Sequence, residues 1–251
     1  MTARLTVAVI TWNEEARLRR CLESVAWADE IVVVDAASTD KTATIAREFT
    51  DHVFVHPWEG FARQKNRAVE RATGDWVLSL DADEEVGDEL RESIRRVLAS
   101  DAGPNGYTVA RRNIFWGRFI RHGRLYPDWQ LRLFRRGAGR FVDRDVHESV
   151  EVTGTVTRLD GALVHESYRD VADFLERTNR YTSLAADEWV RSGRPIRARE
   201  LCVRPLARFF SMYVLHAGFL DGWRGFLLAT LYAYYVFLRS AKVWERVRLR
   251  S

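Results

Sequence analysis

The chain has 251 residues, 47% of them hydrophobic and 29% charged, and its net charge at pH 7 is +4. These values are ordinary for a globular protein, so we expect one large α/β domain, or one domain with an appendage. The two cysteines, Cys21 and Cys202, are too few and too far apart for a disulfide framework or a zinc site, which fits a reducing, cytoplasmic setting.

Strands and helices alternate along the N-terminal part of the chain. Residues 5–10 (LTVAVI) predict a buried strand and are too short for a signal peptide. Apolar residues at helical spacing predict a helix over 14–25, with Cys21 on its apolar face. Similar patterns predict strands over 31–34 and 53–56 and helices over 41–49 and 61–72. This alternation is typical of a parallel sheet with right-handed crossovers, which binds ligands at the carboxyl ends of its strands.

The stretch 74–85 (GDWVLSLDADEE) combines an apolar strand with a dense group of acids. Acids at the end of a buried strand repel one another and resist burial, so they need a cation or water. Two of them, Asp81 and Asp83, are placed to turn toward one hard metal ion that bridges phosphate oxygens. The alternative is an acidic turn before a helix that begins near Asp88. The four acids are Asp81, Asp83, Glu84 and Glu85.

Polar side chains follow three of the predicted strands, which indicates a nucleotide site at one edge of the sheet. Neither a GxGxxG nor a GxxxxGKS/T pattern is present, which argues against a dinucleotide site and a P-loop. Phosphate charge would then be balanced by a metal ion and by arginines. The polar residues are Thr11 and Asn13 after the first strand, Asp35 after the second, and Asp81 and Asp83 after residues 76–80.

The second half predicts the mixed part of the sheet, where an acceptor substrate would lie. A helix is expected over 88–99 and another over 170–189, with strands over 107–111, 129–134 and 155–164 between them. Residues 105–140 contain nine arginines and a single acid, Asp128. Such a segment predicts a basic surface for phosphate or anionic lipid.

Residues 201–244 are dense in aromatic and aliphatic side chains interrupted by arginines. The longest uncharged run, 225–238, would reach only about 21 Å as a helix, whereas a hydrocarbon core is about 30 Å thick. Two amphipathic helices joined near Asp221 and Gly222, lying in a membrane interface, fit better than a span. The alternative is a helical pair packed on the sheet. We therefore expect a catalytic domain over 1–190, with a nucleotide half (1–100) and an acceptor half (101–190), and a membrane-associating helical extension over 191–251.

Several segments together resemble family-2 glycosyltransferases with the Rossmann-like, mixed-sheet GT-A fold. They are residues 11–14 (TWNE), 33–35 with 38–40, 63–66, and 74–83. Ala36 and Ala37 depart from the pattern, because many members have Asp-Gly or Ser-Gly there, and this leaves Asp35 as the sole acid after its strand. The segments GFARQKNRAVERATGDWVLSLDADE, DWQLRLFRR and DVHESV, with the aromatic tail, are similar to lipopolysaccharide inner-core β-1,4-glucosyltransferases that modify heptose.

The resemblance implies a role for each matching residue in binding the donor. Asp35 would accept the uracil N3–H, Thr11 would contact the base or ribose, and Asp81 would contact the ribose. Asp83 would hold a divalent ion, Mg²⁺ or Mn²⁺, on the diphosphate. The implied nucleotide-binding residues are Thr11, Asn13, Asp35, Arg63, Lys65 and Asp81.

The resemblance also implies residues for the transfer step. Glu148 would be the general base that activates an acceptor hydroxyl, and Asp128 is the alternative base. Arg132 would stabilise the diphosphate, and His165 would join Asp83 at the metal. An inverting transfer is a single displacement and needs no carboxylate nucleophile.

The expected function is transfer of a hexose, with glucose as the expected sugar, from a UDP-sugar to a hydroxyl of a lipid-linked saccharide, namely lipopolysaccharide core heptose. The expected location is the cytoplasmic face of the inner membrane, with peripheral attachment and no nucleic-acid partner. One alternative is transfer to polyprenyl phosphate, which is itself anionic and would need no base. Another is a non-catalytic GT-A scaffold that binds a membrane or partner. A nucleotidyltransferase is disfavoured, because no glycine-rich phosphate loop follows the first strand.

Overall fold

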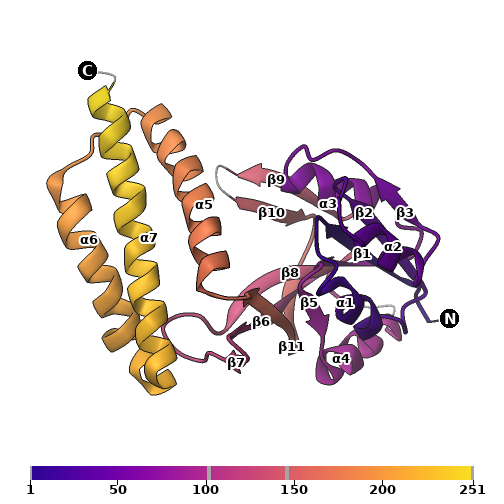
Figure 1. The fold of residues 1–251 in the computed structure, drawn as a ribbon. Helices are drawn as coiled ribbons and strands as arrows, with labels where there is room; N and C mark the ends of the chain where they lie inside the picture. The colour runs from indigo at the N-terminus through magenta and orange to yellow at the C-terminus, as the bar shows by residue number, and fades with distance from the viewer. Residues whose placement is uncertain (1, 101–102, 145–146, 250–251) are drawn as a thin grey trace. The chain divides into compact units, whose positions relative to one another are not determined.

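The computed structural model describes residues 2–100, 103–144 and 147–249, with the side chains of 143–144, 147–148 and 249 outside the described part (Figure 1). The chain forms two compact units. Unit 1 comprises the residues up to Arg111 together with Trp129–His165, and unit 2 comprises Arg112–Asp128 and the residues from Glu166 onward.

Among the described residues, the main sheet has nine strands in the order β3-β2-β1-β4-β8-β6-β11-β5, with β7 paired to β6. The pairs β1–β2, β1–β4 and β2–β3 are parallel, whereas β4–β8 and β11–β5 are antiparallel. A parallel N-terminal half that continues into a mixed sheet was expected, and it is confirmed. The strands are β1 (Leu5–Thr11), β2 (Glu30–Asp35), β3 (Val53–Val55), β4 (Trp76–Asp81), β5 (Glu84–Val86), β6 (Gly106–Phe115), β7 (Arg118–Phe119), β8 (Asp128–Arg135) and β11 (Val156–Tyr168), and β9 (Gly139–Arg144) and β10 (His147–Val152) form a separate hairpin.

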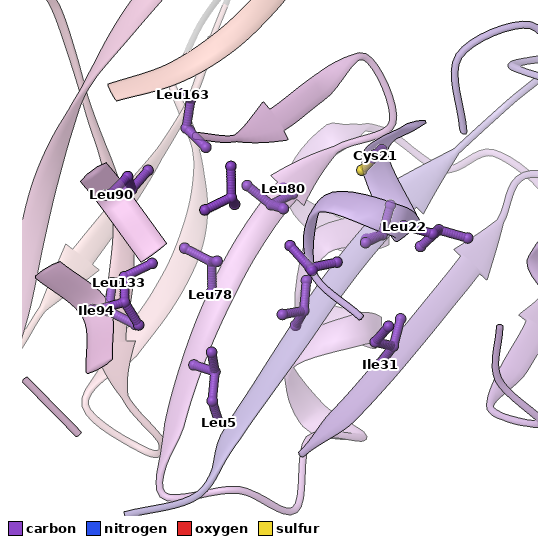
Figure 2. Close-up of a cluster of buried hydrophobic side chains, with 14 of the residues drawn as sticks. Leu5, Cys21, Leu22, Ile31, Leu78, Leu80, Leu90, Ile94, Leu133 and Leu163 are labelled. Carbon is purple, nitrogen blue, oxygen red and sulfur yellow. The ribbon is translucent and has the colours of Figure 1, made fainter. Parts of the chain in front are cut away.

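The helices of unit 1 cover both faces of the sheet, because the strands are apolar on both sides. On one face, Leu78 and Leu80 of β4 pack with Leu22 of α1 and Leu90 of α4, as Figure 2 shows. On the other face, Ala62 and neighbouring small residues of α3 pack against alternate residues of β1, β2 and β4. Burying one such leucine contributes about 1.5–3 kcal/mol, so the packing on both faces stabilises the sheet. The helices are α1 (Leu18–Ser24), α2 (Thr42–Arg47), α3 (Phe61–Glu70) and α4 (Asp88–Leu98).

The short strand β5 was not expected from the sequence. Two of the four acids after β4, Glu84 and Glu85, turn back and pair with β11, and Glu84 stands opposite His165. Gly161 makes the close approach of α4 to β11 possible, because a Cβ atom there would lie 2.5 Å from the backbone nitrogen of Leu90. The turn-back brings an acid of β5 and a histidine of β11 to the end of β4.

Unit 2 contains three long helices, α5 (Val171–Arg191), α6 (Ala198–Phe210) and α7 (Gly222–Leu249). A π-helical turn (Ser211–Leu215) and a 3₁₀ turn (Gly218–Asp221) join α6 to α7, which confirms two helices joined near Asp221 and Gly222. Asp170 caps α5 by accepting a hydrogen bond from the backbone N–H of Asp173. Helix α7 packs on both α5 and α6. Within the described residues, no helix combines the length and the apolar character that a membrane crossing requires.

Candidate active site

The carboxyl ends of β1 and β2 place Thr11 beside Asp35, because the two residues are register partners in the parallel pair. Both are buried, and the Asp35 carboxylate accepts hydrogen bonds from the backbone N–H and the hydroxyl of Ser38, at 2.8 and 2.5 Å. The Thr11 hydroxyl is buried and has no hydrogen-bond partner in the described structure. Since buried polar groups are normally paired, Thr11 is suited to a ligand at this edge.

Asn13 has a structural role in joining the loops after β1 and β2. The side-chain oxygen of Asn13 accepts a hydrogen bond from the backbone N–H of Thr39 at 2.8 Å. The backbone N–H of Asn13 donates to the Ser38 hydroxyl at 2.8 Å. Its φ of 52° lies in the left-handed region, which asparagine tolerates better than most residues. Contact between Asn13 and a nucleotide stays a prediction.

Asp81 and Glu84 share the buried Arg132 at the end of β4, where Asp81 also contacts the buried Lys65. Lys65 Nζ lies 2.8 Å from Asp81 Oδ1, and Arg132 Nη2 lies 2.7 Å from Asp81 Oδ2. The same Arg132 nitrogen lies 2.6 Å from Glu84 Oε1. The other oxygen of Glu84 accepts the Asp81 backbone N–H at 3.1 Å, and Arg111 lies 3.5 Å from Glu84. Lys65, Glu84 and Arg132 are almost fully buried, so this cluster anchors α3, β4, β5 and β8 together.

The charges in this cluster stabilise one another. Burial alone would raise the pKa of Asp81, but Arg132 and Lys65 together bring that pKa far below its ordinary value. Burial likewise opposes the charge on Arg132, and the Asp81 and Glu84 carboxylates raise its pKa in return. Lys65 and Arg132 were expected to face the nucleotide or its diphosphate, and here both bind these carboxylates. Their contact with a donor stays a prediction.

Asp83 lies at the turn between β4 and β5, with its side chain 13% exposed. Its Oδ2 lies 3.5 Å from His165 Nε2 and 3.7 Å from Arg17 Nη1. Burial would raise the pKa of Asp83, but the hydrogen bond from His165 and the nearby positive charge lower it, so the carboxylate is ionised at neutral pH. The sequence predicted that Asp83 and His165 meet, and the structure brings them together.

The Asp83 and His165 donors suit a divalent ion. Carboxylate oxygen and imidazole nitrogen both bind Mn²⁺, and Mg²⁺ typically takes one or two carboxylates and leaves its other positions to phosphate and water. Two ligands at right angles on an ion at about 2.1 Å lie about 3 Å apart, close to the 3.5 Å between these atoms. Among the described side chains, no group of three or more His, Cys, Asp or Glu gathers around one point. The pair therefore fits an ion completed by a diphosphate.

Arg63 is exposed on α3 and lines a pocket of about 450 Å³ with Arg140 and Phe141 of β9. Asn66 closes this region of unit 1 through two hydrogen bonds to the Phe141 backbone, at 2.8 and 2.9 Å. The Arg63 guanidinium lies 3.5 Å from Glu59. Contact between Arg63 and a nucleotide stays a prediction.

The two candidate bases, Glu148 and Asp128, lie on different strands. The backbone of Glu148 lies in β10, and its side chain is outside the described part of the chain. Asp128 begins β8 and belongs to unit 2, whereas Asp83 and His165 belong to unit 1. The choice between them stays open.

Sequence reasoning missed the roles of two residues in this site. Glu84 was counted among the acids after the strand but not as a buried partner of Arg132. Arg17 was not singled out from the sequence, yet its side chain is only 7% exposed and lies 2.7 Å from Glu14. The acidic i−3 neighbour Glu14 was the available signal that Arg17 is held in place.

The buried cluster predicts strong coupling between Lys65 and Asp81. Lys65→Met leaves a buried carboxylate with one cation and should cost roughly 3–5 kcal/mol of unfolding free energy. Adding Asp81→Asn should recover part of that loss, with a coupling energy of about 1–3 kcal/mol in urea unfolding. The matched control is the exposed pair Arg19 and Glu48, at 2.6 Å, whose coupling should stay below about 1 kcal/mol. Equal coupling energies for the Lys65–Asp81 pair and the Arg19–Glu48 pair would contradict strong coupling within the buried cluster.

Comparison with known proteins identifies the family. The sequence model described as Glycosyl transferase family 2 matches residues 6–152, more than half of the chain. A Rhizobium meliloti protein named lipopolysaccharide core biosynthesis glycosyltransferase LpsC is 34% identical over 254 residues, which cover 98% of this chain and 94% of the relative.

Two solved structures show the same fold. Mannosyltransferase PcManGT from Pyrobaculum calidifontis, solved with GDP-Man and Mn²⁺, gives a TM-score of 0.55 at 18% identity and covers 97% of this chain and 88% of its own. S. aureus TarS 1–349, solved with UDP-GlcNAc, gives a TM-score of 0.50 at 16% identity. The match covers 99% of this chain and 92% of the TarS chain. The mixed sheet, the acids that follow β4 and the match over residues 6–152 agree: the chain belongs to glycosyltransferase family 2 and has the GT-A fold.

Proposed function

We propose that this glycosyltransferase moves glucose from UDP-glucose to a hydroxyl of a lipid-linked saccharide in the lipopolysaccharide core, with inversion and with Mg²⁺ or Mn²⁺. The observation that carries the proposal is the pair Asp83 and His165, 3.5 Å apart beside the Asp81 cluster. The relative named for lipopolysaccharide core biosynthesis supports the acceptor class. UDP-GlcNAc in the TarS structure supports a UDP-linked donor.

The residues divide the binding of the donor among them. Asp35 and Thr11 would hold the uracil and ribose at the ends of β1 and β2, where the Thr11 hydroxyl has no partner within the described structure. Asp83 and His165 would hold the divalent ion. When bound, that ion would stabilise negative charge on the departing diphosphate. Lys65 and Arg132 hold Asp81 and Glu84 and so position the turn that carries Asp83.

The proposed transfer is a single displacement. The acceptor hydroxyl oxygen forms a bond to the anomeric carbon while the bond from that carbon to the UDP oxygen breaks. Glu148 accepts the proton of the acceptor hydroxyl. Because the acceptor attacks opposite the departing UDP in one displacement, the anomeric configuration inverts. Asp128 is the competing candidate for this role.

A membrane location follows from the acceptor. We propose peripheral attachment at the cytoplasmic face of the inner membrane, with residues 191–251 as the membrane-associating part. Large apolar side chains that remain exposed on α6 and α7, such as Leu206, Phe210 and Phe226, support this proposal. Apolar side chains next to arginines are typical of helices that lie in a membrane interface.

Asp83→Asn tests the donor site. Loss of the ionised carboxylate should abolish the thermal shift that UDP gives with Mn²⁺ and lower sugar transfer about 10²- to 10³-fold. Glu85→Gln is the matched control, because it removes the same charge two residues away, where the side chain is 35% exposed and lies 3.5 Å from Arg20. Unchanged transfer by Asp83→Asn would refute the assignment. A wild-type chain without any UDP-dependent shift would instead favour the non-catalytic scaffold.

Glu148→Gln tests the base and the acceptor class together. Removing a general base should lower kcat roughly 10²- to 10⁴-fold with a truncated core saccharide and UDP-glucose, measured by UDP release. Asp128→Asn should leave kcat close to wild type. The reverse pattern would make Asp128 the base. If both Glu148→Gln and Asp128→Asn were silent, a hydroxyl acceptor would be contradicted and polyprenyl phosphate favoured.

A further inference from the structure

Unit 2 contains a basic pocket that the donor site does not use. It has a volume of about 470 Å³ and is lined by Arg121, His122, Arg124, Tyr126, Pro127 and His216. Residues 121–127 form the loop between β7 and β8, and His216 follows the π-helical turn after α6. No carboxylate is among the lining residues, so the pocket has the charge of an anion site.

Hydrogen bonds hold the two walls of this pocket together. The backbone N–H of Gly123 donates to the His216 carbonyl at 2.9 Å. Asp221 accepts the backbone N–H of His122 at 2.8 Å and that of Arg121 at 3.4 Å, and its Oδ2 lies 3.3 Å from His122 Nδ1. The Asp221 carboxylate is therefore bound by the backbone of Arg121 and by the backbone and ring of His122. The pocket is built by contacts within unit 2.

The two arginines of the pocket, Arg121 and Arg124, are accessible to a ligand. Both side chains are exposed, Arg121 lies on the Phe119 ring at 5.7 Å, and neither guanidinium forms an ion pair with a described acid. Arg124 adopts a φ of +63°, a conformation that costs a side-chain-bearing residue free energy and persists where its surroundings impose it. A guanidinium fork matches the oxygens of a phosphate, and Tyr126 adds a hydroxyl donor.

Strongly exposed apolar side chains lie between α6 and α7 and at the start of α7, close in sequence to His216 and Asp221. Leu215 is 67% exposed, Leu220 60% and Trp223 61%, and they flank His216 and Asp221 in sequence. Figure 1 shows the connection between α6 and α7 at one end of these helices, with the last turn of α5 at the other end of the three helices. Apolar side chains beside arginines match the two layers of a membrane surface, acyl chains and phosphate head groups.

We propose that the Arg121/Arg124 pocket binds the phosphate of an anionic membrane lipid while Leu215, Leu220 and Trp223 insert among the acyl chains. The site would hold unit 2 on an anionic bilayer and so present the chain to its lipid-linked acceptor. This inference rests on the proposed membrane location but not on the proposed sugar transfer.

Vesicle co-sedimentation of the full chain tests the site. The wild type should bind phosphatidylcholine vesicles that contain phosphatidylglycerol much more tightly than pure phosphatidylcholine vesicles. Arg121→Gln with Arg124→Gln should weaken binding to the anionic vesicles roughly 30-fold, because each arginine near such a surface contributes a factor of about 5. Leu215→Ser with Leu220→Ser should weaken binding to both kinds of vesicle.

The matched control is Arg191→Gln with Arg194→Gln, which removes the same charge at the far end of the helices and should change binding less than about threefold. Equal weakening by the two arginine pairs would overturn the pocket and leave only general charge attraction. If the wild type did not co-sediment with anionic vesicles, the proposed membrane location would be refuted as well. Inorganic phosphate that raises the Tm of the wild type but not of Arg121→Gln/Arg124→Gln, with no vesicle binding, would make the pocket a site for a soluble phosphate and refute the lipid. The UDP-dependent thermal shift of each variant reports the donor site separately.

Discussion

The pairing of Asp81 and Glu84 with Lys65 and Arg132 is the interaction on which the site depends. Four charged groups meet where β4 ends, and three of their side chains are almost fully buried. Desolvating each ion costs several kcal/mol, which only close opposite charges and hydrogen bonds offset. Because the cluster joins α3, β4, β5 and β8, it fixes the turn on which Asp83 stands. Asp83 remains at the margin, 13% exposed, where an ion can reach it.

Much of the fold could be predicted from the sequence because its core strands are apolar along their length. Residues 5–10, 31–34 and 76–80 gave three adjacent strands, and their order along the chain indicated which polar residues share an edge. The pairing of Asp83 with His165 came from the family resemblance, since no periodicity links residues so far apart. Strand β5 was missed because three residues, two of them acidic, carry no strand signal.

The partners of the charged residues were the part that sequence could not supply. Propensity and spacing report the neighbours of a residue along the chain, whereas Glu84 and Arg132 meet across a sheet. Lys65 illustrates the limit: the resemblance implied contact with the nucleotide, and it did not reveal that tertiary packing buries Lys65 against Asp81 and the Phe141 ring. In unit 2 the amphipathic pattern located α6 and α7 correctly, but it could not show that Gly123 and His216 join to build a basic pocket.

We propose that Asp83 stays ionised and accessible because it holds a divalent ion beneath a UDP-sugar. The most direct measurement is the anomalous difference density of manganese in a crystal of the full chain soaked with UDP and MnCl₂. We expect a manganese peak within coordination distance of the Asp83 carboxylate, of His165 Nε2 and of the UDP diphosphate. UDP bound without such a peak, with Asp83 still facing His165 and Arg17 directly, would contradict it.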